Sequence, residues 1–181
     1  MSTEKLFPLA GHHNHDSGAV SNGVKEADLT KELRNLVLCE LDEFGFVDYE
    51  TDNDNDSLGV VIKKIHPTAT DVVFDIHFNA SSNPEATGTE VLISSQAGEK
   101  SKALATEVAA YTANLLGIKN RGVKTEAESA RGRLAILNLK GAACLLEVCF
   151  ITNPNDLKSY HANKERLAKA LAVLLIKYHN S

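Results

Sequence analysis

The chain has 181 residues, of which 43% are hydrophobic and 24% are charged, and its formal net charge is −5. This length is sufficient for one domain with a substantial apolar core. The negative charge argues against a nucleic-acid partner, which calls for a basic face, and no apolar run reaches the roughly 18 residues of a membrane span. We therefore expect a single domain over residues 1–181 that binds neither nucleic acid nor membrane and is monomeric.

The N-terminal sequence MSTEKLFPLAGHH contains one lysine and a broken apolar run of about five residues. Such a run is too short for the apolar core of a secretory signal. We therefore expect the protein to be made in the cytoplasm without a signal peptide.

In chain order, the first part alternates short apolar segments with amphipathic ones. KLFPLA is typical of a strand, and leucines at steps of three and four after Ala27 are typical of a helix, which Gly45 ends. FVDYE is compatible with a strand, and LGVVIKKI with a short helix before Pro67. The predicted elements here are strands 5–10 and 46–50 and helices 27–44 and 58–65.

The polar segment TDNDND, residues 51–56, matches the first three ligand positions of a calcium loop through Asp52, Asp54 and Asp56. The match ends there, because Ser57 stands where the loop needs glycine and Lys63 where it needs glutamate. We interpret the segment as a solvated turn.

The second part contains β-branched and aromatic runs that are typical of strands, and two longer amphipathic segments that are typical of helices. Strands that alternate with crossover helices predict a single-domain α/β fold. Its sheet would be twisted, mixed and mostly parallel, with α-helices on both faces. The predicted elements here are strands 72–78, 90–95, 133–137 and 143–150 and helices 99–116 and 164–178.

Three chemically active side chains fall at the ends of predicted strands. His12 follows the first strand, His77 is next to last in VVFDIHF, and Glu147 interrupts ACLLEVCF. Ligands of open α/β sheets bind outside the carboxyl ends of the strands. A lone strand histidine is commonly structural, but an unpaired buried carboxylate is costly unless a cation accompanies it. Spacing alone leaves a metal site and a structural role both open.

The three cysteines, Cys39, Cys144 and Cys149, form neither a disulfide framework nor a CxxC metal pair. We interpret all three as small structural residues, with Cys39 and Cys144 in the core.

Four segments, taken in order, resemble the signature blocks of the zinc-dependent N-acetylmuramoyl-L-alanine amidases, and the resemblance extends over nearly the whole chain. These enzymes hydrolyse the amide bond between the lactyl group of muramic acid and the first L-alanine of the peptidoglycan stem peptide. The matching segments are GHHNHDSGA, NGVKE, DIHFNAS and LLEVCFITNPND.

The resemblance implies a role for individual residues. His12, Glu26 and His77 match the ligands of one Zn²⁺ per chain, and Glu147 matches the catalytic carboxylate. The resemblance also suggests two substrate-binding residues, Asn79 in DIHFNAS and Arg121 in RGVK.

The chain departs from the family pattern at three positions. Cys149 and His13 stand where glycines are usual, and Asn14 replaces a second glycine after the first ligand. His13 and His15 are therefore expected to be loop residues rather than ligands.

The expected residue types suit amide hydrolysis. Two imidazoles and a carboxylate leave one metal position open, as in catalytic zinc sites, and zinc acidifies water and polarises a carbonyl. Glu147 would act as general base and then as general acid. The expected partner is peptidoglycan. A lone catalytic domain resembles a phage or prophage lysin that acts on the cell wall after release, and a bacterial enzyme with an unusual export route is the alternative.

Two other functions remain open at this point. A cysteine peptidase acting on cell-wall peptides through Cys149 and His77 would be blocked by a thiol alkylator and indifferent to a chelator. A non-catalytic peptidoglycan-binding module would bind the polymer without releasing stem peptide.

Overall fold

The computed structural model describes residues 4–129 and 132–181, so the first three residues of the expected domain, and residues 130–131, lie outside the description. The described chain alternates strands and helices along most of its length. The strands are β1 (Leu6–Ala10), β2 (Val20–Ser21), β3 (Val24–Lys25), β4 (Val72–Asn79), β5 (Thr89–Ile93), β6 (Asn120–Thr125) and β7 (Ala142–Phe150). The helices are α1 (Glu26–Glu43), α2 (Leu58–Lys64), α3 (Glu99–Leu116) and α4 (Pro154–His179), with 3₁₀ turns η1 (Glu126–Glu128) and η2 (Ala135–Asn138).

Five strands form one sheet in the order β1-β4-β7-β5-β6. The β1–β4, β4–β7 and β5–β6 pairs are parallel, and only the β5–β7 pair of this sheet is antiparallel. The expectation of a mostly parallel mixed sheet is therefore confirmed.

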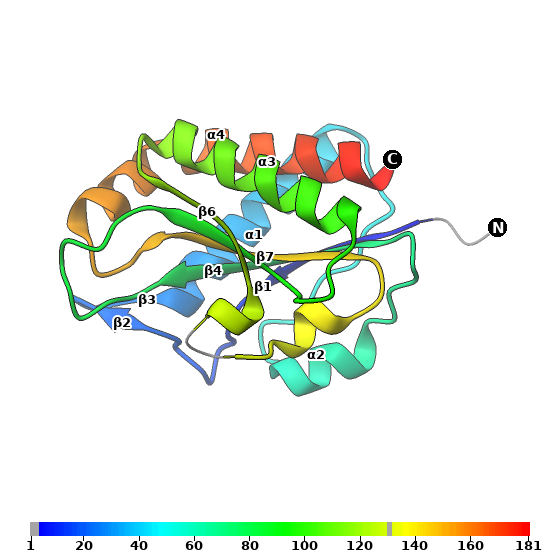
Figure 1. Cartoon of the computed structure of the whole chain (residues 1–181), viewed down its shortest axis with the longest axis horizontal. Helices are drawn as coiled ribbons and strands as arrows, with labels where there is room; N and C mark the ends of the chain where they lie inside the picture. Colours follow the sequence, from blue (N-terminus) through cyan, green and yellow to red (C-terminus); the bar gives the residue numbers. More distant parts are fainter. Residues whose placement is uncertain (1–3, 130–131) are drawn as a thin grey trace.

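Helices cover the two faces of the sheet unequally (Figure 1). The long helices α1, α3 and α4 pack on one face, where alternate strand residues such as Phe74, Ile76 and Leu146 join the larger apolar core. The short elements α2 and η2 cover part of the other face over a smaller core that includes Val73 and Leu145. The expectation of helices on both faces is also confirmed.

This alternation decides where the polar strand residues point. Side chains of successive strand residues point to opposite faces, so Asp75 and His77 share the face of Val73, and Glu147 shares the face of Leu145. The polar residues near the ends of β4 and β7 therefore lie on the face that the long helices leave open.

Two predicted strands are wrong. Residues 46–50 run beside the edge strand β1 and pair with it only through an isolated parallel bridge between Tyr49 and Leu6, so they form no ladder and leave Val47 79% exposed. Residues 133–137 do not form a strand; the 3₁₀ turn η2 lies there and buries Ile136 and Leu137 against the sheet. A short apolar run alone does not distinguish a strand from a buried turn.

Some elements lack a strong apolar signal and were not predicted. The edge strand β6 reads NRGVKT, with one aliphatic residue. The β2–β3 hairpin turns at Asn22 and Gly23, which both have positive φ and form the dipeptide favoured in tight hairpins. Helix α4 begins ten residues before the predicted residue 164, at a start marked by the Asn153 cap and Pro154.

Two further observations concern the cysteines and the apolar character of the helices. Cys144 is buried as expected, and Cys149 is buried too. The expectation that Cys39 lies in the core is wrong, because Cys39 points away from the inward stripe of α1 that includes Val37 and Leu41. Among the described residues, no helix has the length and apolar character needed to span a membrane.

The carboxylate of Asp156 joins three parts of the fold. It is 1% exposed and accepts hydrogen bonds from Thr87 Oγ1 (2.5 Å), Gly88 N (3.1 Å) and Phe150 N (3.0 Å). The start of α4 is thereby tied to the end of β7 and to the segment entering β5.

We expect Asp156→Ala to lower the free energy of unfolding by about 2–4 kcal/mol, because it leaves buried N–H donors without an acceptor. Urea denaturation measures the change. Asn155→Ala, one residue earlier on an exposed position of the same helix turn, is the matched control and should change stability by less than about 0.5 kcal/mol. Equal losses in both variants would contradict this role for Asp156.

Candidate metal centre and active site

The centre of the site is the carboxylate of Glu26, the first residue of α1, which is fully buried. Its Oε1 accepts a hydrogen bond from Phe78 N (3.1 Å) and lies 3.0 Å from His77 Nδ1. Its Oε2 accepts a hydrogen bond from Ala19 N (3.0 Å) and lies 3.0 Å from His12 Nε2. The three side chains expected as metal ligands thus present donor atoms that all lie within 4.8 Å of one another.

Two aspartates that the sequence analysis missed orient the imidazoles. Asp16 Oδ2 lies 2.9 Å from His12 Nδ1, and Asp75 Oδ2 lies 3.2 Å from His77 Nε2. Each carboxylate holds the ring nitrogen that faces away from Glu26, as is usual for the partners of metal-binding histidines. The signal was present in the sequence for Asp75, because strand residues two apart share a face.

Glycines make room for the cluster. A Cβ on Gly18 would lie 2.6 Å from His12 Nε2 and 2.7 Å from Glu26 Oε2, and Gly18 also has a φ of +61°. A Cβ on Gly11 would overlap the His77 ring. His12 itself has a φ of 68°, a left-handed conformation that side-chain-bearing residues rarely adopt and that is found mainly at functional sites.

The cluster attracts positive charge. Burial disfavours a charged His12 imidazole, but Glu26 and Asp16 outweigh it and raise the pKa of His12. Burial likewise opposes charge on His77, yet Asp75 and Glu26 raise its pKa well above the ordinary value. Burial would raise the pKa of Glu26, but the two imidazoles hold it below its usual range. An anionic, buried set of this kind stabilises a cation between the rings.

The residues fit a metal ion. Two imidazole nitrogens and one carboxylate oxygen are a donor set typical of catalytic zinc. The buried Nε2 of His12 forms no hydrogen bond within the described part of the chain, although Glu26 lies close to it. The structure therefore contains a possible metal site at His12, Glu26 and His77.

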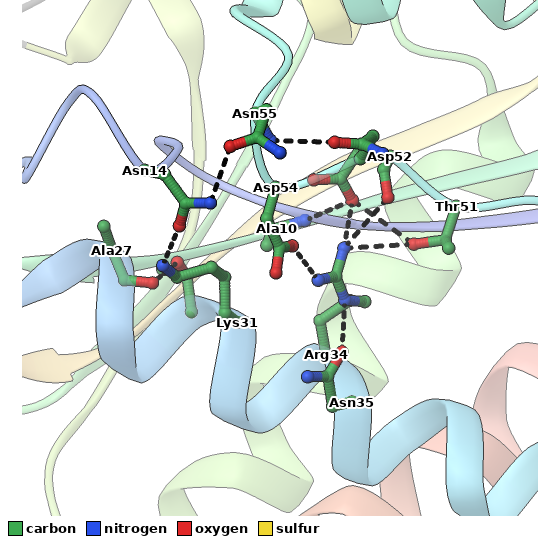
Figure 2. A network of polar contacts seen from close by, with 12 residues as sticks. Ala10, Asn14, Ala27, Lys31, Arg34, Asn35, Thr51, Asp52, Asp54 and Asn55 are labelled. Atoms are coloured by element: carbon green, nitrogen blue, oxygen red, sulfur yellow. Dashed lines mark hydrogen bonds and ion pairs between the residues drawn. The ribbon is translucent and has the colours of Figure 1, made fainter.

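An ion-pair network centred on the buried Arg34 anchors the loop that carries His12 (Figure 2). Arg34 of α1 is 3% exposed and pairs with Asp52 and Asp54. Asp52 in turn accepts a hydrogen bond from Ala10 N (3.1 Å), and Asp54 O accepts one from Asn14 N (2.7 Å). The interpretation of residues 51–56 as a solvated turn is therefore wrong for Asp52, whose side chain is 2% exposed because Arg34 compensates its charge.

Glu147 lies beside the cluster in a row of paired residues that crosses the sheet. It is the register partner of His77 on β4 and of Glu90 on β5. Glu147 and Glu26 both line a cavity of about 370 Å³, which also contains Asn79 and Arg121. We call this the Arg121 cavity. The three residues that the sequence analysis singled out for catalysis or substrate binding therefore share one cavity with the expected ligand Glu26.

Glu90, also missed by the sequence analysis, organises the polar residues of the Arg121 cavity. It accepts hydrogen bonds from Arg121 Nε (2.7 Å), Lys124 Nζ (2.6 Å) and Asn79 Nδ2 (3.0 Å). Burial opposes ionisation, but Arg121 and Lys124 outweigh it and lower the pKa of Glu90. Glu90 is thus an ionised carboxylate between two cations.

A second cavity, of about 390 Å³, lies on the other side of the cluster. His12 and His77 line it together with residues of α2, including Leu58 and Val61; we call it the α2 cavity. His13 lies at its edge, and its Nδ1 accepts a hydrogen bond from His15 N (3.3 Å). Neither His13 nor His15 belongs to the metal cluster, as expected.

Comparisons with known proteins agree with this architecture. A family model described as N-acetylmuramoyl-L-alanine amidase matches residues 9–177. The chain is 28% identical over 182 residues to the N-acetylmuramoyl-L-alanine amidase LytC of Bacillus subtilis (strain 168), covering 97% of this chain and 36% of LytC. It is 28% identical over 154 residues to the endolysin of Bacillus phage SPP1, covering 81% of this chain and 55% of the endolysin.

The fold is similar to that of a solved relative. The crystal structure of N-acetylmuramoyl-L-alanine amidase from Clostridium difficile 630 superposes with a TM-score of 0.78 at 22% identity, over 99% of this chain and 98% of that chain. The chain thus spans a whole solved domain, but about a third of LytC and about half of the endolysin.

We expect Gly11→Ala to reduce bound zinc to well below one equivalent, because its methyl group would displace the His77 ring. Gly59→Ala is the matched control, since Gly59 lines the α2 cavity but a Cβ there meets nothing within 4 Å. Metal content is measured after dialysis against zinc, with circular dichroism to verify folding. A folded Gly11→Ala protein with a full zinc complement would contradict the close packing of His77 on Gly11.

Proposed function

The chain belongs to the N-acetylmuramoyl-L-alanine amidase family, and on that premise we propose that it is a zinc-dependent enzyme acting on peptidoglycan. The proposed reaction is hydrolysis of the amide bond between the muramic acid lactyl group and the L-alanine of the stem peptide. The observation that carries the proposal is the cluster of His12, Glu26 and His77, with Glu147 beside it in register with His77.

His12 Nε2, His77 Nδ1 and a carboxylate oxygen of Glu26 are the atoms proposed to hold the ion. The chemistry that zinc supplies when bound is that of a Lewis acid, which polarises a carbonyl and lowers the pKa of water. Asp16 and Asp75 keep the two imidazoles in orientation. These two contacts support the proposal, because a loose imidazole would bind a cation more weakly.

Glu147 is the proposed proton carrier. Its carboxylate would take a proton from the attacking water and deliver it to the alanine nitrogen as the amide bond breaks. Its position supports this role, because it lines the same cavity as Glu26. General acid–base transfer requires such a side chain within hydrogen-bond reach of the reacting atoms.

The two alternative functions are less well supported. Cys149 is fully buried in the core under the long helices, and burial raises the pKa of its thiol well above the ordinary value. A thiolate nucleophile is therefore not available there. A non-catalytic binding module has no need of a carboxylate such as Glu147 beside a possible metal site.

We expect the purified, zinc-loaded protein to release stem peptides with a free N-terminal L-alanine from peptidoglycan. Mass spectrometry of the digest identifies the cleaved bond. Treatment with EDTA should abolish the release and added Zn²⁺ should restore it, whereas iodoacetamide should have little effect. Release that survives thorough chelation, or that iodoacetamide blocks, would overturn the zinc mechanism.

We expect Glu147→Gln to lower the rate of stem-peptide release by about 10²–10⁴-fold, the usual contribution of positioned proton transfer. The variant should still bind about one zinc, because Glu147 is not a proposed ligand. Cys149→Ala, two residues away on the same strand, is the control and should retain activity. A zinc-loaded Glu147→Gln protein of normal activity would remove Glu147 from the mechanism, and an inactive, folded Cys149→Ala protein would favour the peptidase.

A further inference from the structure

We infer, on the basis of the proposed amidase function, that Arg121 binds a carboxylate on the stem-peptide residue that follows the L-alanine. The peptide then runs from Glu147 across β5 toward β6, and the muramic acid side of the bond faces the α2 cavity. An enzyme with this arrangement distinguishes a free carboxylate at that residue from a carboxamide.

The sheet register sets the direction and the length of this path. Glu147 on β7 is paired with Glu90 on β5, and β6 is the next strand. Neighbouring strands are about 4.8 Å apart, and an extended peptide advances about 3.3–3.6 Å per residue. Arg121 occupies an irregularity in the β5–β6 pairing, opposite the segment between Thr89 and Val91. The Arg121 side chain reaches back to Glu90 on β5, one strand spacing from β7, so a peptide cleaved at Glu147 reaches the guanidinium within about two residues.

The guanidinium of Arg121 is held in place with donors to spare. Its Nε donates to Glu90 (2.7 Å), and its planar group lies 5.1 Å from the centre of the Phe150 ring. Nη1 makes one long contact, 3.5 Å to Thr87 O, and Nη2 makes no hydrogen bond among the described residues. The side chain is 30% exposed and lines the Arg121 cavity. Two N–H groups on a fixed plane are suited to a carboxylate.

Arg121 is the one arginine or lysine in the described lining of the Arg121 cavity, which also includes Glu26, Glu90 and Glu147. Glu90 is shared between Arg121 and Lys124, so its single carboxylate does not by itself occupy the guanidinium of Arg121. Glu128 also lines the cavity, but its carboxylate accepts hydrogen bonds from Thr125 N and Oγ1 (both 2.8 Å).

The described lining of the α2 cavity offers no guanidinium to a carboxylate. That lining includes four aspartates and three histidines, two of which are the proposed ligands, and no lysine or arginine. Some of these aspartates are paired, as Asp52 is with Arg34 and Asp56 with Lys64, but none of them attracts a carboxylate. The acidic peptide is therefore assigned to the Arg121 cavity rather than to the α2 cavity.

The test compares two synthetic substrates, N-acetylmuramoyl-L-alanyl-D-isoglutamate and N-acetylmuramoyl-L-alanyl-D-isoglutamine, which differ only in carboxylate against carboxamide. We expect the zinc-loaded protein to cleave the carboxylate compound with a kcat/KM about 10- to 100-fold higher, the range for a charge-assisted bidentate contact. Calorimetric binding of the released dipeptides should show the same order of preference.

Variants assign the preference to Arg121. Arg121→Gln should reduce the kcat/KM ratio toward one, and Arg121→Lys should restore part of it, because lysine retains the charge but not the planar pair of donors. Arg166→Gln removes a positive charge from α4, on the opposite face of the sheet, and should leave the ratio unchanged. Thermal unfolding of each variant verifies that the comparison is made on folded protein.

The outcomes separate this inference from the proposed function. Cleavage of both substrates with equal efficiency, or a preference that Arg121→Gln retains, overturns the assignment to Arg121 and leaves the amidase function standing. Cleavage of neither substrate by the zinc-loaded wild-type protein overturns the amidase function itself, and the assignment with it.

Discussion

The burial of one carboxylate, that of Glu26, is the constraint on which the site depends. A buried charge is tolerated only when surrounding groups compensate it. Here two backbone N–H groups, from Ala19 and Phe78, and two imidazoles converge on it. The β2–β3 region, the start of α1 and the end of β4 must therefore come together around Glu26, and the proposed cation would complete the compensation.

The unequal covering of the sheet gives this cluster access to a substrate. Three long helices seal one face, whereas α2 and η2 cover only part of the other (Figure 1). The row of His77, Glu147 and Glu90 crosses the open face, with one cavity on each side of the cluster. Because a scissile bond has two ends, two cavities lined by different side chains can orient it. The buried Arg34 network then fixes the loop of His12 against α1, the helix that begins with Glu26 (Figure 2).

Most of the fold could be predicted from local patterns, and the failures have physical causes. Helices α1, α2 and α3 agree with their apolar spacing to within about one residue, and the buried strands β1, β4 and β7 agree with their apolar runs. The edge strand β6 was not predicted, because a strand at an exposed edge needs few apolar residues and β6 has one. Residues 133–137 were misassigned because burial of Ile136 and Leu137 looks the same in the sequence whether a strand or a 3₁₀ turn achieves it.

The sequence by itself determined the α/β class and, through four ordered motifs, the candidate ligands and Glu147. These features are local, because strand alternation, helix periodicity and motif spacing are properties of neighbouring residues. Only the tertiary structure decided which carboxylate holds which imidazole. It also decided that the buried Asp52 forms an ion pair with Arg34, and that Glu90 accepts hydrogen bonds from both Asn79 and Arg121. Those contacts join residues on different strands and loops, and strand order and register, which no local pattern specifies, bring them together.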